Sequence, residues 1–250
     1  MTVKSVLFLA FPNVGEQDLL VPWELFRAVA WDKAQRGEKL EVVLGSFEDG
    51  LVPTHMGTAI KPDRKILPTD RFDMVFVPGG VGAGVQSQNE TLLEFLRAHK
   101  QEGRWVAANC AGMAPLQRSG VIRAVPVTSS ATLARGLAAE GALVASPRLA
   151  WKIAPEHKVF SAGGAGTVHP SSIALVWHLF GDAAGRALAA GWDALPLFGE
   201  ALFSLDGPVM NDDPQVKAQL QDAWQNVFLP QPEPQAVGST SCASGACAVA

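Results

Sequence analysis

The feature that most constrains the fold is a series of short, mostly apolar runs that alternate with segments of helical periodicity. Runs of this kind are typical of strands buried on both faces. The intervening segments 17–30 and 91–100 place apolar residues at helical spacing. This alternation predicts βαβ units, and hence an α/β fold with a mostly parallel sheet covered by helices on both faces. The first predicted strands are residues 5–11, 40–44, 72–77 and 105–108.

The alternation of predicted strands and helices continues along the rest of the chain. Residues 48–60 carry turn signals typical of a hairpin excursion. We expect one domain over residues 1–228, with its core at about 4–195, and a flexible low-complexity tail over 229–250. Further strands are predicted at residues 125–128, 143–151 and 158–161, and helices at 111–119, 132–140, 171–180, 183–192 and about 215–228.

Composition narrows the function classes. The chain of 250 residues is 48% hydrophobic and 18% charged, with a net charge of -4 and no cluster of five or more Lys or Arg. We therefore expect neither nucleic acid nor a membrane as a partner, but a small-molecule substrate. The longest apolar run is too short for a membrane span or a signal peptide, so we expect a cytoplasmic protein. No metal-ligand spacing or nucleotide-binding motif is present, and we expect no cofactor.

Four predicted strands end in segments that can meet at one edge of the sheet, where parallel sheets place their functional crevice. These segments are FPNVGEQD, VPGGVGAG, ANCAG and SAGGAG, and we expect Gly164 in the last of them to bind an oxyanion or substrate. We therefore expect the functional site at this edge.

The first candidate at this edge is Cys110. It lies between an apolar strand and a predicted helix, with the small residues Ala108 and Gly112 two positions before and after it. A nucleophile held on a tight strand-to-helix turn needs this pattern. The amides at the helix start, including that of Ala111, can lower a thiol's pKa and bind an anion. The alternative is a buried structural cysteine, and Cys242 and Cys247 in the tail have no predicted role.

The neighbouring loops supply the other candidates. The amides of Gly79 and Gly80 can face an oxyanion beside the thiol, although a plain βα turn explains them equally. A carboxyl of Asp18 or Glu16 can exchange a proton with the thiol, or serve only in the first turn of a helix. Among the histidines, only His169 is well placed for the site, although a position at a helix start or on the surface is the more common role for such a residue.

Two further histidines receive other assignments. His55 is expected in the hairpin excursion, and His99 on an exposed helix face. Neither is predicted to reach the site.

The same segments resemble the ThiJ/PfpI superfamily, which has the class I glutamine amidotransferase-like fold. The resemblance covers roughly residues 4 to 195 and rests on FPNVGEQDLLVPWELF, FDMVFVPGGVGAG, RWVAANCAGMAPLQRSGVI and VFSAGGAGTVHPSSIALVWHLF. Within the superfamily the sequence is most similar to the isonitrile hydratase branch, whose D-L-x-x-P stretch matches Asp18, Leu19 and Pro22. It is also similar to the sensor domains of AraC-type regulators.

The resemblance implies a flavodoxin-like three-layer sandwich and a homodimer with sites near the subunit interface. It implies that Cys110 attacks an isonitrile carbon, that Asp18 positions water, and that the product is an N-substituted formamide. The amides of Gly79, Gly80 and Ala111 would line an anion pocket. A sensing module without turnover, or a glyoxalase-like or stress-related thiol activity, remain alternatives.

The sequence departs from the branch around these residues. Ala111 stands where the branch has Thr, Ser130 stands where many members have His, and His169-Pro170 stand near the usual Gly-Ile-Asp. The nucleophile, acid and glycine loop are kept, so these departures question the isonitrile substrate more than the reactive cysteine.

Overall fold

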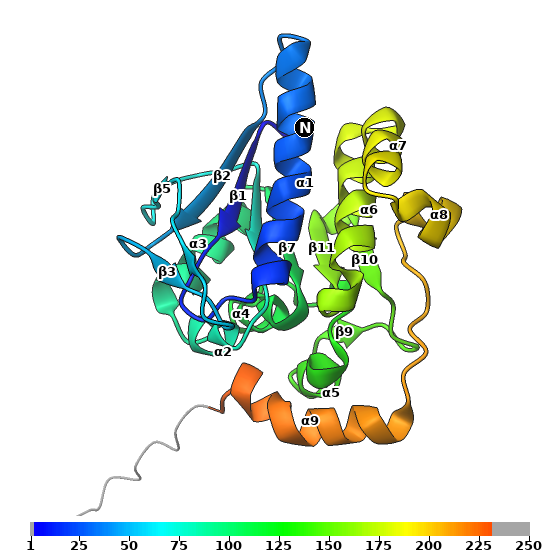
Figure 1. The fold of residues 1–250 in the computed structure, drawn as a ribbon. Helices are drawn as coiled ribbons and strands as arrows, with labels where there is room; N and C mark the ends of the chain where they lie inside the picture. Colours follow the sequence, from blue (N-terminus) through cyan, green and yellow to red (C-terminus); the bar gives the residue numbers. More distant parts are fainter. Residues whose placement is uncertain (1–2, 232–250) are drawn as a thin grey trace, which may run out of the picture.

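The computed structural model describes residues 3–231, and in this part of the chain the main sheet has seven strands in the order β10-β11-β7-β6-β1-β2-β5 (Figure 1). Every neighbouring pair is parallel except β10 with β11. The predicted mostly parallel α/β sheet is therefore confirmed. The strands are β1 (Ser5–Leu9), β2 (Glu41–Ser46), β5 (Arg64–Lys65), β6 (Met74–Val77), β7 (Trp105–Asn109), β10 (Trp151–Ala154) and β11 (Val159–Ala162).

Helices cover both faces of this sheet. In Figure 1, α1 and α6 contact each other in front of the sheet, while α3 and α4 contact each other behind it. The strand order explains the two layers: β1 to β2 and β6 to β7 step in opposite directions, so their right-handed crossovers fall on opposite faces. The helices are α1 (Glu16–Gln35), α2 (Gly82–Gln86), α3 (Glu90–Gln101), α4 (Met113–Arg118), α5 (Ala131–Ala139), α6 (Val168–Phe180), α7 (Asp182–Gly191), α8 (Ala194–Phe198) and α9 (Pro214–Phe228).

The centre of the sheet is apolar on both faces. Val6, Leu7 and Phe8 of β1 are each 0% exposed, and Phe8 packs against Phe76 with ring centroids 5.2 Å apart. Burial of such side chains is the main favourable contribution to folding. This explains why the strands appear in the sequence as continuous apolar runs.

Two strand predictions were wrong in part. Residues 143–151 form two short strands, β9 (Leu143–Val144) and β10, separated by a loop that contains Pro147. A proline cannot donate to a strand ladder, so one continuous strand does not form. The predicted strand 125–128 is β8 (Pro126–Val127), which pairs with β9 outside the main sheet. The hairpin excursion is confirmed as β3 (Val52–Pro53) and β4 (Ala59–Ile60).

The prediction for His99 was also wrong. Its side chain is 0% exposed; its Nε2 accepts from the Phe72 backbone N–H at 3.2 Å, and its Nδ1 lies 2.8 Å from the Phe95 carbonyl oxygen. Burial lowers the pKa of His99 to about 4, so the ring is neutral and belongs to the core.

The last helix, α9, lies across the lower end of the molecule in Figure 1, against α5 and α2. Leu229, just beyond it, is only 1% exposed, so the packed chain continues past the predicted start of the tail. Residues 232–250 of that predicted tail, including both of its cysteines, lie outside the described residues.

Between residues 3 and 231, no helix combines the length and apolar character needed to cross a membrane.

Candidate functional site

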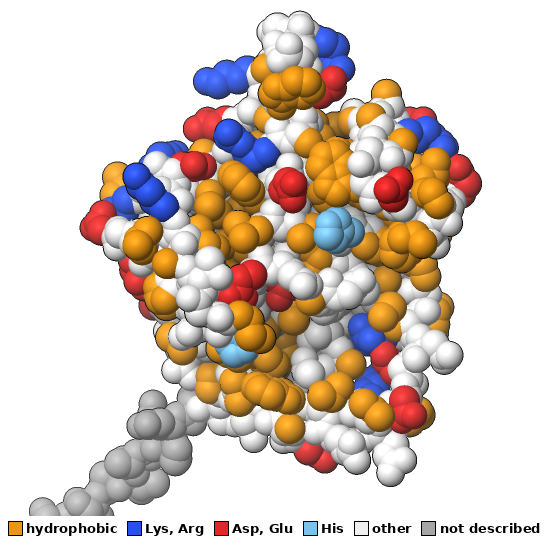
Figure 2. Space-filling view, viewed as in Figure 1, with side chains coloured by type: hydrophobic (Ala, Val, Ile, Leu, Met, Phe, Trp, Pro, Cys, Tyr) orange, Lys and Arg blue, Asp and Glu red, His pale blue; other side chains and the backbone are white. Residues whose placement is uncertain are grey.

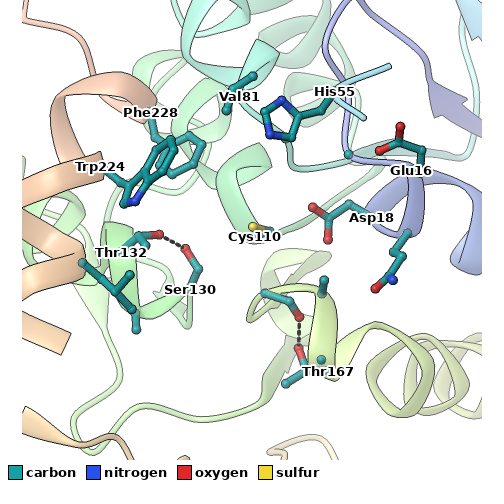
Figure 3. A pocket seen from close by; sticks show the side chains of 18 of the residues that line it. Glu16, Asp18, His55, Val81, Cys110, Ser130, Thr132, Thr167, Trp224 and Phe228 are labelled. Carbon is teal, nitrogen blue, oxygen red and sulfur yellow. Dashed lines mark hydrogen bonds between the residues drawn. The ribbon is translucent and has the colours of Figure 1, made fainter. Parts of the chain in front are cut away.

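The loops that follow β1, β6, β7 and β11 meet at one pocket of about 850 Å³, at the predicted edge of the sheet. Figure 3 shows Cys110 at its floor, with the Asp18 carboxyl beside it. Gly80 and Gly164 also line this pocket. Gly79 and Ala111 lie directly behind the lining, next to Cys110.

Cys110 follows β7 on a tight turn. Its φ of 48° lies in the left-handed region, which is strained for a residue other than glycine. A 3₁₀ turn (Cys110–Gly112) then leads into α4. A Cβ on Gly112 would lie 2.1 Å from the carbonyl oxygen of Val77, so only glycine permits this turn. The strand-to-helix elbow predicted around Cys110 is thus present.

Asp18, in the first turn of α1, faces the thiol. Its side chain is only 5% exposed, and its Oδ1 has no hydrogen-bond partner among the described residues. Burial raises the pKa of Asp18 to about 7, although hydrogen bonding with the Cys110 thiol acts to lower it. Near neutral pH this carboxyl can therefore both donate and accept a proton.

The Cys110 thiol also holds its proton more tightly than a free cysteine. Burial and the nearby Asp18 carboxyl raise the pKa of Cys110, while the amides of Ala111 and Gly80 act to lower it. The sequence predicted the effect of the amides but not the larger opposing effects. Taken as a whole the residue is only partly buried, and it lines the pocket.

Gly79 allows the thiol and the carboxyl to approach each other. A Cβ at this position would lie 2.4 Å from Oδ2 of Asp18 and 2.6 Å from Cβ of Cys110. No side chain fits there. The role of Gly79 in the structure is therefore close approach; its amide donates to Asn109, so the expectation that this amide faces an anion beside the thiol was wrong.

Asn109 fixes the three loops relative to one another. Its Oδ1 accepts from the Gly79 N–H at 3.0 Å, and its Nδ2 donates to the Asp18 carbonyl oxygen at 2.9 Å. The Gly15 N–H also donates to the Gly79 carbonyl oxygen at 3.0 Å. Buried hydrogen bonds of this kind hold a site in one geometry.

Glu16 has a different role from Asp18. Its Oε1 accepts from the Thr54 hydroxyl at 2.5 Å and from the Met56 N–H at 2.8 Å. Burial acts to raise the pKa of Glu16, but these hydrogen bonds outweigh it and hold the pKa below the ordinary value. Glu16 therefore holds the β3–β4 hairpin against the pocket as a carboxylate.

His169 does not reach the pocket. Helix α6 begins at Val168, before the predicted start at residue 171, so His169 lies in its first turn with an exposed side chain. The histidine that does line the pocket is His55, from the hairpin (Figure 3).

The sequence interpretation missed the aromatic wall and the basic group of the pocket. Trp224 and Phe228 of α9 line it opposite His55 (Figure 3). Their helical spacing was visible in the sequence, but nothing indicated which part of the molecule they face. Arg148 also lines the pocket and forms an ion pair with Asp212, with Nε 2.9 Å from Oδ2.

A metal centre is not built by the described residues. Across residues 3–231, no three His, Cys, Asp or Glu side chains gather in a geometry that holds a metal ion.

A parallel sheet with a cysteine on a strand-to-helix turn and a buried carboxyl against it defines a class, the flavodoxin-like α/β proteins with a cysteine elbow. The comparison with known families narrows this class. The DJ-1/PfpI family matches residues 4–168, and the chain belongs to that family.

Two curated relatives match about half of the chain. An isonitrile hydratase of Pseudomonas putida is 27% identical over 124 residues, which cover 49% of this chain and 50% of the hydratase. Protein dj-1beta of Drosophila melanogaster is 27% identical over 131 residues, which cover 50% of this chain and 65% of that protein. The chain thus matches less than two thirds of the length of each relative.

Solved structures confirm the fold. A ThiJ/PfpI family protein from Pseudomonas syringae superposes with a TM-score of 0.71 at 16% identity, covering 91% of this chain and 88% of that one. Drosophila melanogaster DJ-1beta superposes with a TM-score of 0.62 at 20% identity, covering 77% of this chain and 98% of that one.

Proposed function

We propose that this chain is a cysteine-dependent hydratase that converts an organic isonitrile and water into an N-substituted formamide. The observation that carries the proposal is the pair at the pocket floor, the cysteine that lines the pocket beside a buried carboxyl whose pKa is raised to about 7. The match to a protein named isonitrile hydratase supports the substrate class.

The first step is addition of the thiol to the terminal carbon. The Asp18 carboxyl gives its proton to the isonitrile carbon while Sγ of Cys110 bonds to the same carbon, and the thiol proton passes to the carboxylate. The S–H bond breaks and the N–C bond order falls from three to two as the C–H and C–S bonds form, and the product is a thioimidate on Cys110. A carboxyl with a pKa near neutrality suits this relay.

The second step is hydrolysis of the thioimidate. Water bonds to its carbon and gives a proton to Asp18 as Asp18 protonates the nitrogen. The resulting adduct collapses by breaking the C–S bond, and its hydroxyl proton returns through Asp18 to the sulfur. The products are the formamide and the free thiol, so no oxidant or reductant is needed. The amides of Gly80 and Ala111 face the sulfur and stabilise negative charge on it during both steps.

A second candidate is a binding or sensing module without turnover. The observation that favours it is the raised pKa of Cys110, because a protonated thiol is a weak nucleophile unless Asp18 activates it. The two candidates differ in whether a bound isonitrile is converted. The predicted homodimer also stays a prediction, which sedimentation can test.

The test is formamide production from alkyl and aryl isonitriles, followed by chromatography. We expect turnover by the wild type, its near-complete loss in Cys110→Ala, and a decrease of about 10²- to 10⁴-fold in Asp18→Asn. Because the relay begins with the neutral acid, kcat/KM should fall as the pH rises above about 7. The matched control is Asp32→Asn, at an exposed position of the same helix, which should retain wild-type activity.

Absence of formamide with every isonitrile would refute the hydratase proposal. Saturable binding without conversion would then favour the sensing module. Conversion that survives in Cys110→Ala would refute the role given to the thiol.

A further inference from the structure

We propose that helix α9 makes this site selective for substrates with a flat, uncharged aromatic body, so that aryl isonitriles are preferred over short alkyl isonitriles. The proposal rests on the proposed function for the reacting group, but the aromatic selectivity has its own evidence in the pocket wall.

One face of α9 forms that wall. Leu220, Trp224 and Phe228 are spaced four residues apart on the helix, and all three line the pocket. The rings of Trp224 and Phe228 are stacked, with centroids 6.0 Å apart and an interplanar angle of 23°. Both side chains lie on the same side of the pocket as Ser130 and Thr132 (Figure 3).

This surface is not covered by the described part of the chain. Trp224 is 41% exposed and Leu220 is 37% exposed, and contiguous exposed apolar surface of this kind marks binding sites. Figure 2 shows hydrophobic side chains gathered over α9, along the lower edge of a hollow. An aromatic ligand stacked on Trp224 would remove this surface from water.

The wall is fixed in place rather than loose. A Cβ on Gly84 would lie 2.0 Å from the carbonyl oxygen of Val227, so a glycine in α2 lets α9 approach closely. Gln221 is 7% exposed, and its Nε2 donates to the Ala131 carbonyl oxygen at 3.0 Å. A wall held by such contacts can distinguish ligands by shape.

The charges of the pocket favour an uncharged ligand. Its acidic residues are Glu16, engaged by the hairpin, and Asp18, whose raised pKa leaves it about half neutral near pH 7. Its arginine, Arg148, is 7% exposed and forms a two-point ion pair with Asp212. To bind these charged side chains, a charged substrate would therefore have to displace the hairpin from Glu16 or Asp212 from Arg148.

The size of the pocket agrees with this class. A volume of about 850 Å³ lies within the range of about 300–1,000 Å³ that holds drug-sized ligands. A short alkyl isonitrile would leave most of it filled with water. Because Cys110 and the α9 wall line the same pocket, the proposal places the aryl group along that wall with its isonitrile carbon at Cys110.

The test compares 2-naphthyl isonitrile with ethyl isonitrile. We expect the wild type to show a higher kcat/KM for the naphthyl compound, and Trp224→Ala to reduce the ratio of the two values by about tenfold or more. The matched control is Trp192→Ala, which truncates a tryptophan 36% exposed at the end of α7 and outside the pocket lining, and should keep the wild-type ratio.

A binding measurement separates this proposal from the proposed function. The ligands are the two product amides, N-(2-naphthyl)formamide and N-ethylformamide. Their binding requires no turnover, so calorimetry reports their affinities even if no isonitrile is hydrated. Tighter binding of the naphthyl amide, weakened in Trp224→Ala, supports the aromatic class. Equal affinity for the two amides would overturn the proposal. So would a Trp224→Ala variant that changes the oligomeric state but leaves the affinity for the naphthyl amide unchanged.

Discussion

The buried carboxyl of Asp18 makes a quantitative prediction about stability. The fold raises its pKa from an ordinary value of 3.8 to about 7, so the folded state holds this proton more tightly than the unfolded chain does. Below a pH of about 4 both states are protonated. As the pH rises toward 7, the unfolded chain releases the proton first, and the folded state loses stability relative to it.

The size of the loss follows from the two pKa values. Each unit of difference corresponds to about 1.4 kcal/mol, so a shift from 3.8 to about 7 corresponds to a loss of about 4 kcal/mol between acid and neutral pH. Above a pH of about 7 the folded state also releases the proton, and the loss stops growing. The Asp18→Asn variant has the same shape but nothing to titrate. We therefore expect the free energy of unfolding of Asp18→Asn, minus that of the wild type, to increase by up to about 4 kcal/mol as the pH rises from about 4 to about 7.

The assay is urea unfolding of both proteins at several pH values between 4 and 8.5, followed by tryptophan fluorescence. The amide introduced by Asp18→Asn forms different hydrogen bonds from the carboxyl, which can shift the free energy of unfolding by the same amount at every pH. This shift does not matter because only the pH dependence is compared. The exposed Asp32→Asn substitution is the matched control and should show no comparable growth.

The contact between Asp18 and the Cys110 thiol provides a second test of the same prediction. Hydrogen bonding by Cys110 lowers the pKa of Asp18, so in a Cys110→Ala background the same window should extend to higher pH. A stability difference that stays flat with pH, or that shrinks as the pH rises, would refute the assignment of a neutral buried carboxyl.

Two further predictions concern the loops around this pair. Gly79→Ala would place a Cβ 2.4 Å from Asp18 Oδ2 and 2.6 Å from Cys110 Cβ, so we expect a destabilisation of about 1–3 kcal/mol and a loss of turnover. Denaturant unfolding checks this against Gly191→Ala, where an added Cβ meets nothing within 4 Å, and equal effects of the two changes would contradict it. Glu16→Gln should speed hydrogen exchange in the β3–β4 hairpin, because a neutral amide holds its donors less strongly; unchanged exchange would argue against the anchoring role.

Much of the fold could be predicted because the strands are buried on both faces and appear as apolar runs. The loops after β1, β6 and β7 could then be brought together, since the carboxyl ends of parallel strands share one edge. The meeting of Asp18, Gly79 and Cys110 follows from this topology without any knowledge of distances.

The walls of the pocket could not be predicted in the same way. Trp224 lies on a helix whose spacing shows an amphipathic face, but the pattern does not say what that face meets. His55 comes from a hairpin whose position depends on a hydrogen bond to Glu16 across 38 residues of sequence. His169 was offered either to the site or to a helix start at the surface, and the second holds: α6 begins at Val168 rather than near residue 171, because helix ends are set by local contacts that periodicity does not capture.

The side-chain hydrogen bonds of Asn109 have a consequence for folding. They join positions 30 and 91 residues apart, and contacts of such long range carry a large cost of loop closure. A nascent or partly folded chain therefore carries Cys110 as an ordinary thiol, without its carboxyl neighbour. The thiol and carboxyl come together only with the complete tertiary structure, so labelling of Cys110 during refolding should report the moment at which the last loops dock.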